Sequence, residues 1–151
     1  MNIKVFVFDF DGTIVDSNRL KDEAYFELFP VSPKAKEIIA GYKGCRKTRY
    51  QIIREILLAL KELGEIDFSD LEAEVKARAI KFGEIVEQGI VGSNGVLCAF
   101  DLLWFLYNNQ YPAYILTGTP LEPLKKIIGK LVKSGKVPPF KDIYGRIDDK
   151  D

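Results

Sequence analysis

The sequence predicts an α/β protein in which a helical module interrupts a parallel-sheet core. β-branched and aromatic residues fill positions 3–8, as is typical of a strand buried in a parallel sheet. Apolar residues at helical spacing dominate positions 17–91, and an alternation of helix and strand patterns returns after them. We therefore expect a discontinuous core formed by residues 1–16 and 92–151, with residues 17–91 inserted as a helical cap.

The first predicted strand ends at Asp9, an acidic residue that directly follows the apolar run. A continuous run of this kind predicts a strand that helices cover on both faces. In open α/β sheets, ligands bind in the crevice beyond the carboxyl ends of the strands. Asp9 is therefore expected at a position where ligands bind.

Four helices are expected in the inserted module. Apolar residues recur at helical spacing over residues 20–28, 33–41, 53–63 and 71–86, and proline or glycine residues punctuate these stretches. The last of these helices is expected to open with a capping box that begins at Ser69.

The second part of the core begins after turn-forming residues 92–95. The pattern predicts a helix from Val96 to Tyr107 and then a strand over residues 113–117. A further helix is expected to start with Thr119 as its N-cap and to end near Gly135.

A third strand is expected over residues 142–144, where β-forming residues precede Gly145 and an acidic tail. Three strands are few for a parallel sheet of this kind. We therefore predict a Rossmann-like core that is C-terminally incomplete in this sequence, or that a partner completes.

Charge and hydropathy limit the partners of this chain. It has 151 residues, with 22 Lys and Arg against 22 Asp and Glu, so its net charge gives no reason to expect a nucleic-acid partner. No apolar run approaches the ~20 residues of a membrane helix, and the N-terminus has no secretion signal. We expect a soluble cytoplasmic protein with no membrane partner, and the sequence contains no signal for an oligomeric state.

The residue types present also limit the chemistry. The chain has no histidine, which excludes a serine–histidine triad and disfavours a zinc site. Its two cysteines, Cys45 and Cys98, are too few and too far apart for a disulfide framework, and we expect both to be small buried residues. Carboxylates, hydroxyls and lysines are left to perform any reaction.

The strongest functional signal is the pair Asp9 and Asp11, directly after the first strand. Two carboxylates two positions apart at a strand end can face one ligand, so that one attacks phosphorus and the other protonates the leaving oxygen. Their hard oxygens are also the ligands that Mg²⁺ prefers, and Gly12 permits the tight turn that brings them together. The alternative is a solvated turn, in which Asp and Gly are only good turn formers.

Other signals are weaker. Thr117 and Gly118 end the second strand ahead of a helix, where a hydroxyl and backbone amides suit a phosphoryl oxygen, whereas Thr119 is expected to cap that helix. Lys150 is placed to neutralise phosphate charge, or is simply a lysine in an acidic tail. Arg46 lies in a basic loop of the insert and is a candidate substrate clamp, with a solvated turn as the alternative.

Three segments resemble motifs of the haloacid dehalogenase-like hydrolases. Residues 6–17 look like the first motif of this superfamily, residues 115–119 look like its second, and residues 145–150 are similar to the approach to its third-motif lysine. A helical cap inserted after the first motif is also similar to capped members of the family. The resemblance implies a capped phosphatase of the phosphoglycolate phosphatase or β-phosphoglucomutase-like type.

The resemblance implies a role for each matching residue. Asp9 would form an aspartyl-phosphate intermediate, and Asp11 would act first as the general acid and then as the base that activates water. Mg²⁺ would be held by the Asp9 carboxylate and the Asp11 backbone carbonyl. Thr117 would hydrogen-bond the transferring phosphoryl group and Lys150 would stabilise its charge. The remaining substrate contacts are expected from Gly12, Thr13, Gly118 and Arg46.

The reaction implied by the resemblance is Mg²⁺-dependent hydrolysis of a small-molecule phosphate ester. A phosphomutase is the closest alternative, and it differs in returning the phosphoryl group to the substrate. The family's fourth motif, an acidic pair that completes the magnesium site, has no counterpart in these 151 residues. The alternative from another class is therefore a non-catalytic remnant that serves as an interaction module.

Overall fold

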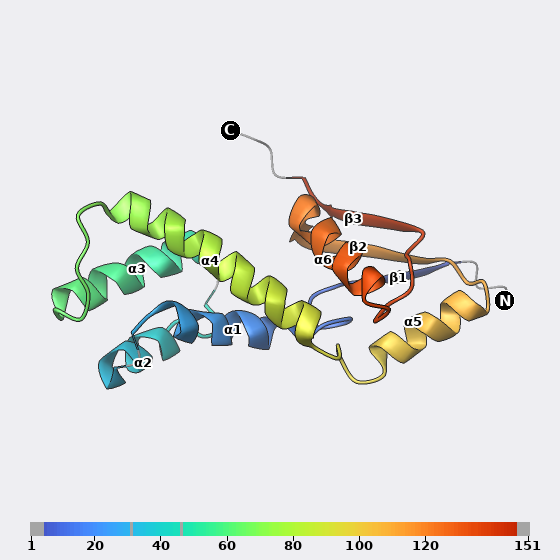
Figure 1. Cartoon of the computed structure of the whole chain (residues 1–151), viewed down its shortest axis with the longest axis horizontal. Helices are drawn as coiled ribbons and strands as arrows, with labels where there is room; N and C mark the ends of the chain where they lie inside the picture. The colour runs from blue at the N-terminus through green and yellow to red at the C-terminus, as the bar shows by residue number, and fades with distance from the viewer. Residues whose placement is uncertain (1–4, 31, 46, 148–151) are drawn as a thin grey trace. The chain divides into compact units, whose positions relative to one another are not determined.

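The chain forms two compact units of helices and strands (Figure 1). The computed structural model describes residues 5–30, 32–45 and 47–147. One unit is formed by Met1–Asn18 together with Glu87–Asp151, and the other by Arg19–Val86. Within the described ranges, no helix has the length and apolar character needed to cross a membrane.

Most of the second unit is made of four helices, which appear in blue to yellow-green in Figure 1. Most residues of the predicted apolar stripes are buried, whereas Leu63, which was predicted to line one of them, is 46% exposed. The rings of Tyr25 and Phe82 pack with their centroids 4.7 Å apart. This unit therefore has an apolar core of its own. The helices are α1 (Ser17–Leu28), α2 (Pro33–Ala40), α3 (Arg49–Glu62) and α4 (Leu71–Gly92).

Side-chain caps fix where three of these helices begin. Ser32 caps α2, and Thr48 caps α3 through a capping box. At α4 the Asp70 carboxylate accepts hydrogen bonds from two backbone N–H groups, at 2.9 and 3.1 Å. The prediction that Ser69 opens this helix is therefore wrong, because the cap lies one residue later.

The first unit contains a three-stranded parallel sheet with the strand order β1-β2-β3 (Figure 1). One helix precedes the middle strand and another connects it to the last strand. This arrangement confirms the predicted α/β fold with a Rossmann-like parallel core. The elements are β1 (Phe6–Phe8), α5 (Ala99–Asn108), β2 (Ala113–Pro120), α6 (Leu121–Lys133) and β3 (Asp142–Arg146).

One face of the sheet is buried and the other is open. Ile115 and Ile143 are paired across β2 and β3, and Ile115 is 0% exposed. Both crossovers run in the same direction across the sheet, so right-handed connections place α5 and α6 on this face. On the opposite face, Val7, Leu116 and Tyr144 are 56%, 60% and 50% exposed. For the residues that the structure describes, the expectation that helices cover both faces is therefore wrong.

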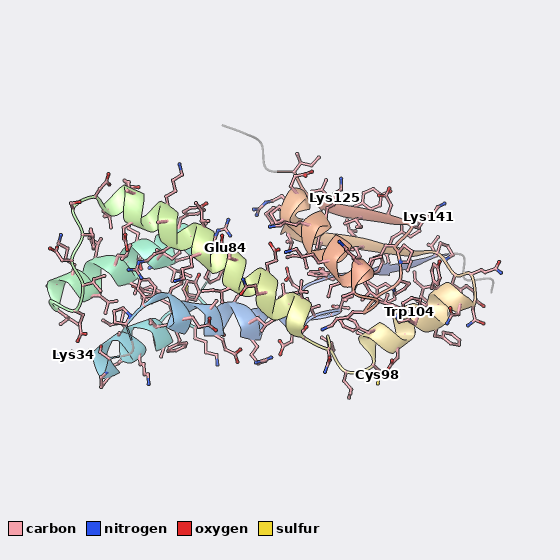
Figure 2. All side chains as sticks on the ribbon, viewed as in Figure 1. Lys34, Glu84, Cys98, Trp104, Lys125 and Lys141 are labelled. Atoms are coloured by element: carbon pink, nitrogen blue, oxygen red, sulfur yellow. The ribbon has the colours of Figure 1, made fainter. Side chains whose placement is uncertain are left out.

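The helix before β2 starts later than predicted. Cys98 has a φ of 62°, in the left-handed region, so the helix begins at Ala99 rather than at Val96. Cys98 is also exposed, in the loop before α5 (Figure 2), and Cys45 is partly exposed. The expectation that both cysteines are buried is therefore wrong, and both are free thiols.

Candidate active site

Asp9 directly follows the last residue of β1, and its side chain is exposed. Its Oδ1 accepts a hydrogen bond from the backbone N–H of Phe10 at 2.7 Å. Phe8 pairs with Ile115 of β2, so the residues that follow these two emerge at the same edge of the sheet. Asp9 therefore lies at the carboxyl end of a parallel strand.

The chain turns sharply after Asp11. Gly12 has a φ of 74°, a left-handed conformation that glycine adopts without steric cost. The Gly12 N–H donates to the Val15 carbonyl at 2.7 Å. The Phe10 carbonyl accepts hydrogen bonds from the N–H groups of Ile14 and Val15, at 3.0 and 3.2 Å. These bonds close a compact turn that fixes the backbone around Asp11.

The loop before α5 is fastened to this turn. The Val96 N–H donates to the Ile14 carbonyl at 2.9 Å. Gly95 approaches so closely that a Cβ at its position would lie 2.8 Å from the same carbonyl oxygen. Lys136 Nζ in turn donates to the Ser93 carbonyl at 2.6 Å. The turn that contains Asp11 is therefore braced by a segment far away in the sequence.

Both carboxylate oxygens of Asp11 accept hydrogen bonds from hydroxyl groups. Ser17 Oγ donates to Oδ1, and Thr119 Oγ1 donates to Oδ2. Ser17 is fully buried at the first residue of α1, and Thr119 lies near the end of β2. Hydrogen bonds to an ionised acceptor are stronger than those between neutral groups. The Asp11 side chain is thus held between a helix start and a strand end.

Thr119 does not have the predicted role of a helix cap. The N-cap of α6 is Pro120, which makes no side-chain hydrogen bond. The Thr119 N–H donates to Thr117 Oγ1 at 3.4 Å, and the Thr119 hydroxyl donates to Asp11. Sequence reasoning missed Thr119 and Ser17 as partners of Asp11. Only their places as the last residues of the first two motifs could have indicated them.

The other predicted site residues lie in different surroundings. Gly12 and Gly118 are exposed, and Thr117 is half-buried within β2. Thr13 is exposed and lines a largely apolar cavity of about 400 Å³ next to the start of α5. Neither Asp9 nor Asp11 is among the residues that line this cavity. Arg46 and Lys150 lie outside the described residues.

Comparison with known families decides the family of the chain. The model of a family described as haloacid dehalogenase-like hydrolase matches residues 3–148. The chain belongs to the haloacid dehalogenase-like hydrolases. The family that the sequence motifs predict is thereby confirmed. A search of curated proteins found no match.

Several solved structures share the fold of this haloacid dehalogenase-like hydrolase. A protein from Thermotoga maritima assigned as a β-phosphoglucomutase has a TM-score of 0.68 at 17% identity, covering 98% of this chain and 64% of its own. A magnesium-bound protein from Bacillus subtilis assigned as a HAD hydrolase, YfnB, has a TM-score of 0.57 at 23% identity, covering 96% and 66%. A predicted phosphoglycolate phosphatase from Haemophilus somnus has a TM-score of 0.53 at 17% identity, covering 95% and 62%. This chain thus spans 62–66% of the length of these proteins.

The donor atoms of this haloacid dehalogenase-like hydrolase suit a hard cation. Mg²⁺ keeps several water ligands and takes one or two carboxylates together with substrate oxygens. The exposed Asp9 carboxylate and the nearby Asp11 backbone carbonyl are oxygen donors of this kind. Among the described residues, no group of three or more His, Cys, Asp or Glu side chains is placed to hold a metal ion.

Proposed function

We propose that this hydrolase cleaves small-molecule phosphate monoesters through a phosphorylated Asp9. The observation that supports this most strongly is the difference between two neighbouring acids. Asp9 is exposed at the end of β1, whereas both oxygens of Asp11 are held by hydroxyl groups. One carboxylate is thus open to substrate, and the other is oriented for proton transfer.

The proposed reaction has two steps. First, an Asp9 oxygen attacks phosphorus, the bond between phosphorus and the ester oxygen breaks, and Asp11 gives its proton to the departing alcohol. Second, Asp11 takes a proton from a water molecule as the water oxygen attacks the phosphorus of the aspartyl phosphate. The bond to Asp9 breaks, inorganic phosphate leaves, and both aspartates return to their starting states.

Each remaining site residue has a proposed contact. Bound Mg²⁺ would supply charge neutralisation at the phosphoryl oxygens. Its proposed protein ligands are the Asp9 carboxylate and the Asp11 backbone carbonyl. Thr117 is proposed to hydrogen-bond the transferring phosphoryl group, and Lys150 to stabilise its charge. Further proposed contacts to the phosphate ester are Gly12, Thr13, Gly118 and Arg46.

Hydrolysis of p-nitrophenyl phosphate, with and without Mg²⁺, tests this proposal. We expect Asp9→Asn to abolish turnover because the amide is not a nucleophile for phosphorus. Asp11→Asn is expected to lower kcat by about 10²- to 10⁴-fold, the usual contribution of a general acid–base group. Asp101→Asn makes the same chemical change at an exposed position in the first turn of α5 and serves as the matched control.

The outcomes separate the alternatives. Full activity of Asp9→Asn would exclude Asp9 as the nucleophile. A wild-type chain without any hydrolytic activity would favour a non-catalytic interaction module. With a sugar monophosphate as substrate, a phosphatase releases inorganic phosphate into solution, whereas a phosphomutase returns the phosphoryl group to the sugar.

A further inference from the structure

The Asp11 carboxylate is fixed by two separate parts of the fold. Ser17 Oγ approaches Oδ1 from the start of α1, and Thr119 Oγ1 approaches Oδ2 from the end of β2. Rotation of the carboxylate about its side-chain bonds would break at least one of these hydrogen bonds. The pair of contacts therefore selects one orientation of Asp11.

The backbone on the Ser17 side is itself held in place. Ser17 is fully buried, and the turn before it is closed by the 2.7 Å hydrogen bond from the Gly12 N–H to the Val15 carbonyl. The same turn accepts the Val96 N–H at Ile14, at 2.9 Å. A buried hydroxyl that directly follows a braced turn has little freedom to move away from its partner.

The backbone on the Thr119 side is held by β3. Pro120 is in register with Arg146, and a Cβ added to Gly145 would lie 2.7 Å from the Thr119 carbonyl oxygen. The backbones of β3 and the Thr119 segment therefore approach as closely as a glycine permits. The Thr119 hydroxyl is not used to cap α6, whose N-cap is Pro120.

We propose that Ser17 and Thr119 are positioning residues that aim the Asp11 carboxylate at the reacting group. This inference rests on the proposed function, in which Asp11 transfers protons. A hydroxyl can both donate and accept a hydrogen bond, so each contact can persist while Asp11 holds the proton that it passes on. Backbone N–H donors would not offer this, because they can only donate.

A pair of substitutions at Thr119 tests the proposal. Thr119→Val removes the hydroxyl and keeps the shape of the side chain, whereas Thr119→Ser keeps the hydroxyl. We expect Thr119→Val to lower kcat by about 10- to 100-fold, which is the loss of rate that a misplaced catalytic group causes. KM should change by less than about threefold, because Thr119 orients the acid rather than binds the substrate. Thr119→Ser should restore most of the lost kcat.

Ser17→Ala should likewise lower kcat and leave KM nearly unchanged. Its matched control is Ser134→Ala, which removes a hydroxyl that donates to the Leu131 carbonyl at 3.0 Å at the end of α6. Melting curves followed by circular dichroism establish that each variant is folded. Unchanged kcat in both Thr119→Val and Ser17→Ala, with an active wild-type chain, would overturn the proposal.

A second measurement does not depend on turnover. The carboxyl ¹³C resonance of Asp11, assigned with Asp11→Asn and recorded without Mg²⁺ or substrate, reports directly on the hydrogen bonds that this carboxylate accepts. We expect the resonance to shift in Thr119→Val and to stay near its wild-type position in Thr119→Ser. An unshifted resonance in Thr119→Val would overturn the proposal, because the contact would be absent. If the wild-type chain is inactive but the resonance shifts as expected, the proposed function fails while the positioning contact stands.

Discussion

At the scale of single residues, Gly145 lies next to the candidate site at a position that has no room for a side chain. A Cβ there would lie 2.7 Å from the Thr119 carbonyl oxygen and 2.9 Å from Leu121 Cα, distances that side-chain carbons do not reach. Gly145→Ala must therefore push β3 away from the segment that contains Thr119. We expect a loss of about 1–3 kcal/mol in the free energy of unfolding, the usual cost of overpacking. Urea denaturation measures this loss.

The matched control for Gly145→Ala is Gly129→Ala in α6. An added Cβ at Gly129 meets no atom within 4 Å, so the same substitution should stabilise the helix by about 0.5–1 kcal/mol. We therefore expect Gly145→Ala to lower the free energy of unfolding and Gly129→Ala to raise it. If Gly145→Ala is as stable as the wild type, β3 does not pack against Thr119 as the structure describes.

The residues of the site were predictable to different degrees. The position of Asp9 at a strand end follows from a local pattern, an apolar run that stops at an acid, and the structure places it there. The pairing of Asp11 with Thr119 joins residues 108 positions apart, so no local pattern specifies it. Thr119 was predicted to be a cap because threonine commonly precedes helices, whereas its hydroxyl donates to a carboxylate on a neighbouring strand end.

At the scale of elements, the end of α4 is tied to α6 by ion pairs. Glu87 is 15% exposed, and its carboxylate accepts hydrogen bonds from Lys130 and, at 2.9 Å, from Lys126. The hydrogen bond from Lys130, and after it the one from Lys126, hold the pKa of Glu87 below its ordinary value of 4.5. A lowered pKa in the folded state means that the stabilisation is present above pH 4.5 and is lost as the pH falls through the folded value.

Glu87→Gln tests this connection. At pH 7 we expect the substitution to reduce the free energy of unfolding by up to about 1 kcal/mol, because both lysines are largely exposed. The difference from wild type should shrink as the pH falls from 4.5 through the lower pKa that Glu87 has in the folded state, because Glu87 then loses its charge in the folded state as well. Glu84→Gln, at an exposed position on the same helix, is the control. If Glu87→Gln changed the free energy of unfolding equally at pH 3 and pH 7, the ion pairs of Glu87 would not contribute to stability.

Helices of the insert were easier to predict than elements of the core. Periodic apolar residues, Pro33 and Gly41 define α2 locally, and the structure has this helix at Pro33–Ala40. The start of α5 was missed because Cys98 adopts a left-handed conformation that is uncommon outside glycine. β2 is longer than predicted because pairing resumes at Pro120 with Arg146 after an irregularity in the register, which depends on another strand.

At the scale of the whole molecule, the division of the sequence into a sheet-forming part and a helical part follows from a change of hydrophobic period. The open sheet face could not be foreseen, because a continuous apolar run does not show which face the helices will cover. That choice depends on strand order. With the order β1-β2-β3, both connections cross in the same direction and put both helices on one side.

Two neighbouring residues of β2 test whether this face is open. Ile115 is 0% exposed and Leu116 is 60% exposed, although both are aliphatic and lie in the same strand. We expect Ile115→Ala to lower the free energy of unfolding by about 2–5 kcal/mol, as for other buried large-to-small substitutions. Leu116→Ala should cost less than about 1 kcal/mol, because its side chain has little to lose on truncation. Urea denaturation at two protein concentrations provides both values. Equal costs for the two variants would mean that another layer of protein packs on Leu116 in solution, and a midpoint that rises with concentration would identify that layer as a second copy of the chain.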